Sequence, residues 1–61
     1  MAALWEPGML VRHPNRPDWG LGQVQSAINA RVTVNFEHAG KVVINIDEIA
    51  LLAEFDHKTR G

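Results

Sequence analysis

The sequence predicts a small all-β domain, a five-stranded antiparallel barrel with a single 3₁₀ turn before its last strand. Three observations predict this fold. The chain has 61 residues and no cysteine, so it holds one domain that must be stabilised by apolar packing rather than by disulfides. Glycine, proline and asparagine divide it into short segments, a spacing typical of small barrels. Its best-defined segment alternates polar and apolar residues with the period of a strand.

That segment is Arg31–Phe36, in which Val32, Val34 and Phe36 share one face and the intervening polar residues share the other. Its β-branched residues suit a pleated, half-buried strand. Lys41–Ile46 has the same alternation, and we interpret it as the strand that returns beside the first.

Two further strands precede this pair. Met9–His13 is a short apolar run that should end at Pro14, because proline cannot donate to a strand ladder. Gln23–Ala27 alternates in the same way as the later strands. Between them, Pro14–Asp18 is predicted to be a loop without regular structure. Gly20 and Gly22 then mark a sharp bend, where one or both should adopt a backbone conformation closed to other residues.

The remaining connections are short. Asn29 should take the left-handed conformation in a tight turn, and Glu37–Gly40 should form a four-residue hairpin loop. Asp47 is the expected cap of one 3₁₀ turn that runs through Ala50. Leu51–Ala53 is the predicted last strand. We therefore place the barrel at residues 1–54 and a flexible C-terminal tail at residues 55–61.

The inward members of the alternating patterns form the expected core. These residues are Val11, Val24, Val32, Val34, Phe36, Val42, Ile44 and Leu51.

The stretch from Pro7 to Leu52 also resembles a known pattern, the tudor-like module at the C-terminus of UvrD/PcrA-type DNA helicases. The residues that carry the resemblance are Gly8–Pro14, Trp19–Val24, Val32–Phe36, Gly40-Lys41 and Ala50-Leu51. More distantly, the chain is similar to the RNA-polymerase-interacting domains of CarD-like regulators and of the transcription–repair coupling factor. As a whole it looks most like a family of small stand-alone bacterial proteins with no assigned function.

The resemblance implies an SH3-like or tudor-like barrel and a partner in transcription or DNA repair, such as RNA polymerase. Two features of this chain depart from the helicase pattern. Asn15–Asp18 lengthens the loop before the aromatic–glycine pair, and Trp19 replaces the usual phenylalanine. No helicase is attached to the module in this sequence.

The residues that we expect to bind a partner are a basic–aromatic set, namely Arg12, Arg16, Trp19 and Lys41. Tryptophan and arginine are the residues most enriched at binding hot spots. Two interpretations of Trp5 and Trp19 stay open, since each ring either plugs an end of the barrel or contacts a partner. His13 should bond to the backbone of the barrel.

The sequence gives no basis for catalysis, a metal or a cofactor. Its three histidines lie in separate segments without metal-ligand spacing, and Ser26 has no adjacent base. Gly20-Leu21-Gly22 lacks the lysine and serine or threonine of a phosphate loop. We therefore expect no enzyme. No signal peptide or membrane span is evident, and we expect a cytoplasmic monomer.

We thus predict a non-catalytic protein-interaction module that presents the loop Asn15–Trp19 or a sheet edge to another protein. The alternative is weak nucleic-acid binding through the basic–aromatic set. A net charge of −1 argues against a general nucleic-acid binder, because such proteins use an excess of lysine and arginine to neutralise phosphates. A third hypothesis is a structural subunit whose apolar edge strand pairs with its own copy.

Overall fold

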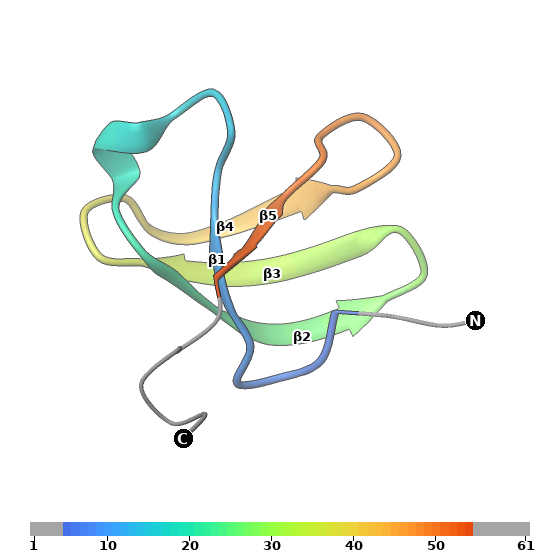
Figure 1. Ribbon diagram of the computed structural model, residues 1–61. Helices are drawn as coiled ribbons and strands as arrows, with labels where there is room; N and C mark the ends of the chain where they lie inside the picture. The colour runs from blue at the N-terminus through green and yellow to red at the C-terminus, as the bar shows by residue number, and fades with distance from the viewer. Residues whose placement is uncertain (1–4, 55–61) are drawn as a thin grey trace, which may run out of the picture.

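A computed structural model describes residues 5–54 and shows one antiparallel sheet with a short 3₁₀ helix (Figure 1). The strand order across the sheet is β4-β3-β2-β1-β5. The elements are β1 (Leu10–Arg12), η1 (Pro17–Trp19), β2 (Gly22–Ile28), β3 (Arg31–Phe36), β4 (Gly40–Asn45) and β5 (Leu52–Glu54). All five predicted strands are therefore present, with ends that differ by at most one residue. The predicted tail at residues 55–61 lies outside the described residues.

The sheet is open, which corrects the expectation of a closed barrel. β5 pairs with β1, so that Leu10 lies opposite Glu54 and Arg12 opposite Leu52. β4 lies at the other end of the strand order and does not pair with β5 among the described residues. Closure requires the two end strands to bond along a shared register. All three residues of β5 pair with β1, whereas β4 pairs with β3 alone among the described strands.

The two hairpins follow the predicted turn chemistry. Asn29 has a φ of 55° in the tight connection between β2 and β3, a region that asparagine tolerates better than most residues. Gly40 has a φ of 76°, and it forms the first residue of β4 opposite Phe36. The register of β2 against β3 shifts between Val24 and Ser26. This bulge bends the long strand β2, as bulges do in strongly coiled sheets.

One face of the sheet forms the core. Its buried hydrophobic residues are Val11, Val24, Val32, Val34, Phe36, Ile44 and Leu51. Seven of the eight expected core residues are thus confirmed as buried. The exception is Val42, which packs against this cluster but is only half-buried. It lies on β4, which has a neighbouring strand on one side only.

The 3₁₀ element lies elsewhere than predicted. It spans Pro17–Trp19, inside the loop that we expected to be irregular. Before the last strand there is instead a hydrogen-bonded turn, in which the N–H groups of Glu48 and Ile49 both donate to the carbonyl of Asn45. The side-chain oxygen of Asn45 accepts from the N–H of Asp47 at 2.9 Å. Asn45 therefore caps this turn in the place that we assigned to Asp47.

The glycine bend before β2 is confirmed. Gly20 has a φ of 79°, and a Cβ at that position would lie 2.7 Å from the Glu37 carboxylate. Gly22 has no positive φ but is packed against the core, since a Cβ there would lie 2.5 Å from Val34. Glycine is thus required at position 20 by the positive φ, and at position 22 because the core leaves no space for a Cβ.

Candidate functional site

Trp19 ends η1 and lies over one end of the core. Its ring packs edge-on against His13 with 4.8 Å between centroids and tilts against Phe36 at 5.2 Å. The residue is half-buried. The two interpretations of this tryptophan are therefore compatible, because one side of the ring rests on the core while part of the residue stays accessible.

The loop that carries Trp19 is held in place by backbone bonds. Pro17 occupies the first turn of η1, where its fixed φ suits the helical conformation. The N–H of Trp19 donates to the carbonyl of Arg16 at 3.0 Å, and the N–H of Gly20 donates to that of Pro17 at 3.2 Å. The long loop is thus a defined turn.

A second set of bonds fastens the end of this loop to the turn between β3 and β4. The N–H of His38 donates to the carbonyl of Trp19 at 3.0 Å. Leu21 and Glu37 bond twice, because the N–H of Glu37 donates to the Leu21 carbonyl and the Glu37 carboxylate accepts from the N–H of Leu21, both at 2.9 Å. In Figure 1, the η1 loop accordingly lies close to the connection between β3 and β4.

His13 is the one buried polar side chain among residues 5–54. Its Nδ1 accepts a hydrogen bond from the backbone N–H of Asn15 at 3.1 Å. This bond joins the ring, as acceptor, to the loop backbone two residues further on, whereas we expected a bond to the backbone of the barrel. An accepting Nδ1 places the proton of the neutral ring on Nε2. His13 thus has a structural role at the start of the loop.

Arg16 lies over the ring of Trp19. Its guanidinium carbon is 5.0 Å from the centre of the tryptophan ring, within the range of a cation–π contact. The guanidinium also bonds to both carboxylate oxygens of Asp18, at 3.3 and 3.4 Å. This hydrogen bond from Arg16 holds the pKa of Asp18 below its ordinary value. We call the set His13, Arg16, Asp18, Trp19 and Phe36 the Trp19 cap.

The other two expected partner-binding residues lie away from the Trp19 cap. Arg12 is on β1, where its Nε lies 3.1 Å from the Glu54 carboxylate on β5. Lys41 is exposed on β4, opposite Asn35. Since β2 and β3 separate β1 from β4, the sheet does not gather Arg12 and Lys41 into one patch. The structure brings together Arg16 and Trp19.

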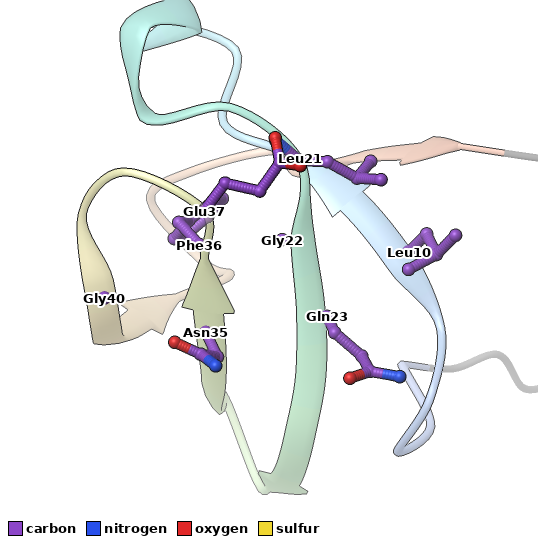
Figure 2. Close-up of a pocket in the computed structure, with 8 residues that line it drawn as sticks. All are labelled: Leu10, Leu21, Gly22, Gln23, Asn35, Phe36, Glu37 and Gly40. Carbon is purple, nitrogen blue, oxygen red and sulfur yellow. The ribbon is translucent and has the colours of Figure 1, made fainter.

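The structure has a surface hollow that the sequence pattern did not predict. It is open to solvent, has a volume of about 510 Å³, and crosses β2 at Gly22. Figure 2 shows Leu10 and Leu21 on one side of Gly22, with Asn35 and Glu37 on the other. Residues of four strands, β1 to β4, line this hollow, so a pattern within one segment gives no signal for it. Among the residues lining it, Glu37 is the one ionisable side chain, and it already accepts from Leu21.

Trp5 is half-buried and packs on the core at the end of β3 opposite to Trp19. With Ala27, Asn29, Val32 and Ile46 it lines a smaller hollow of about 200 Å³. The lining carries no ionisable side chain. This end of the molecule therefore offers an apolar contact at most.

Neither a metal centre nor a membrane helix is found in residues 5–54. No group of three or more histidine, aspartate or glutamate side chains within that range is arranged to hold a metal ion. Within the same range, no helix has the length and apolar character needed to cross a bilayer.

Comparison with known proteins gives one finding. No curated protein and no solved structure matches the chain. A family model described as "Protein of unknown function (DUF3553)" matches residues 5–53, which include every strand of the sheet except the last residue of β5. The chain is therefore a member of the DUF3553 family.

Proposed function

We propose that this protein is a non-catalytic interaction module that binds another protein through the Trp19 cap. The observation that carries the proposal is the exposed Arg16 guanidinium lying over the ring of the partly buried Trp19. Tryptophan and arginine are enriched at binding hot spots. Here the two residues belong to the same turn.

The fixed loop supports the same proposal. Two prolines, η1 and the bonds to Glu37 and His38 restrict the backbone around Trp19. A loop that is ordered before binding loses less conformational entropy on association. Asp18 next to Arg16 gives this surface both signs of charge, so that it favours a polar, mixed-charge contact on the partner.

The partner class comes from the resemblance described above. On the strength of the residues between Pro7 and Leu52, we propose a relationship to the tudor-like modules of UvrD/PcrA-type helicases. The open sheet is, in this proposal, a variant of their SH3-like barrel. A transcription or repair component such as RNA polymerase is then the first partner to test.

The test is capture of partners from a lysate by the immobilised protein, after nuclease treatment. Arg16→Glu should remove the captured partner while leaving the stability within about 0.5 kcal/mol of the wild type, because the side chain is exposed. Trp19→Ala should weaken capture by about 2 kcal/mol or more if the ring is a hot spot. Arg31→Glu is the matched control, since Arg31 is exposed at the far end of β3.

Three results would contradict the proposal. One is that Arg16→Glu still captures every partner while Trp19→Ala unfolds the domain, which would make the Trp19 cap a purely structural plug. Another is that Arg31→Glu loses capture as readily as Arg16→Glu. The third is that nuclease removes all captured bands, which would favour the nucleic-acid alternative. The separation of Arg12 and Lys41 makes that alternative the weaker one.

A further inference from the structure

The free edge of β4 is a feature that the proposed function does not use. β4 ends the sheet and pairs with β3 on one side only. Within residues 5–54, none of the backbone hydrogen bonds made by turns and loops reaches residues 41–44. The backbone groups of residues 41–44 that face away from β3 are therefore available to another strand.

This edge lacks the usual protection against pairing. In natural proteins, proline, bulges, charged side chains or short length prevent an edge strand from pairing with another chain. β4 has six residues and no proline, and its register with β3 is regular throughout. Lys41 is its one charged residue. β5 at the other end of the sheet is protected by its length of three residues and by Glu54.

The side chains of β4 are incompletely covered on both faces of the sheet. Val43 is 59% exposed on the outer face, where its one cross-strand neighbour is Thr33. Val42 points toward the core but stays half-buried. A further strand beside β4 would cover both valines, as cross-strand neighbours do elsewhere in the sheet.

We propose that β4 pairs with β4 of a second copy, antiparallel, about a two-fold axis that passes beside Val43. In this register Val43 lies opposite itself, Val42 lies opposite Ile44, and Lys41 lies opposite Asn45. No like charges face one another across the pair. A contact of this kind is self-complementary and closes as a dimer, and a net charge of −1 gives little repulsion between copies.

The first experiment measures the mass of the full chain by sedimentation equilibrium over a wide concentration range. In place of the monomer expected from the sequence, the proposal predicts a dimer with twice the 6.8 kDa of one chain. Val43→Lys should give the mass of one chain, because it places two lysines opposite each other at the axis. Gln25→Lys is the matched control, since it adds the same charge to an exposed position of the interior strand β2 and should stay dimeric.

The second experiment tests the register. Directly opposed residues of antiparallel strands have Cα atoms about 4.5–5.5 Å apart, which lies within the range that a disulfide spans. The chain has no cysteine of its own, so the variant Val43→Cys carries a single thiol. In the proposed dimer, the two copies of this thiol face each other and should oxidise to a disulfide. Gln25→Cys should form far less of it under the same conditions.

The proposal fails if the wild-type chain has the mass of one copy at every concentration. It also fails if Val43→Lys remains dimeric, which would place the contact on another surface. Assemblies that grow beyond two copies would instead indicate pairing of β4 with β5 of the next molecule, because such a contact does not close.

Discussion

Asp18 shows how the loop fixes the state of a single exposed side chain. The hydrogen bond from Arg16 lowers its pKa, which means that the fold favours the charged carboxylate. The Arg16–Asp18 pair therefore contributes stability at pH values above the ordinary pKa of aspartate. This contribution is lost as the pH falls through the lowered pKa of Asp18. The pair is exposed, so solvent keeps its contribution to stability small.

Replacing Arg16 should accordingly raise the pKa of Asp18 toward its ordinary value. We expect Arg16→Gln to have this effect and Arg12→Gln to leave Asp18 unchanged, because Arg12 pairs with Glu54 instead. The carboxyl carbon of Asp18, followed by NMR during an acid titration, reports the value directly. If both variants titrate as the wild type does, Arg16 is not the cause of the shift.

At the scale of elements, the hairpin between β2 and β3 depends on Asn29. With a φ of 55°, this residue is in a region that costs most L-residues about 1 kcal/mol or more. We expect Asn29→Ala to lower the free energy of unfolding by about 1 kcal/mol, and Asn29→Gly to leave it nearly unchanged. Urea unfolding, followed by tryptophan fluorescence, distinguishes the two variants. Equal losses for alanine and glycine would mean that the asparagine side chain, rather than its backbone, matters.

The strands were predictable because their patterns are local, whereas the turns depend on competition between neighbouring residues. The alternation in Arg31–Phe36 is enough to predict β3 and its buried face. Asp47 and Asn45 are both suitable caps, and only the geometry at the end of β4 shows that Asn45 takes this place. For η1, the prolines indicated a stiff loop but did not show that three residues coil into a 3₁₀ turn.

The candidate site could be predicted in part for the same reason. Arg16 and Trp19 are three residues apart, so a single turn brings their side chains together. Whether Arg12 and Lys41 join them depends on the order of strands in the sheet. That order places two strands between them, which no pattern within one segment reveals.

At the scale of the whole molecule, stability depends on a small core in which Phe36 is the largest buried side chain. It is 2% exposed and also contacts Trp19. We expect Phe36→Ala to cost about 3–5 kcal/mol, which is close to the total stability expected of so small a core. Circular dichroism during heating should show no cooperative transition for this variant.

Asn35→Ala is the control, because Asn35 is the exposed neighbour of Phe36 on β3. It should cost about 0.5 kcal/mol or less. A Phe36→Ala protein that melts cooperatively near the wild-type temperature would mean that the core does not depend on this ring.

The pairing of β5 with β1 has a consequence for the synthesis of the chain. Of the described strands, β1 leaves the ribosome first, yet one of its edges stays unpaired until Leu52–Glu54 have also emerged. The hairpins of β2, β3 and β4 join residues that are near in sequence and can form early. We therefore expect the pairing of β1 with β5, the first and last described strands, to form last. A nascent chain that stalls before residue 52 would expose β1 to pairing with other chains.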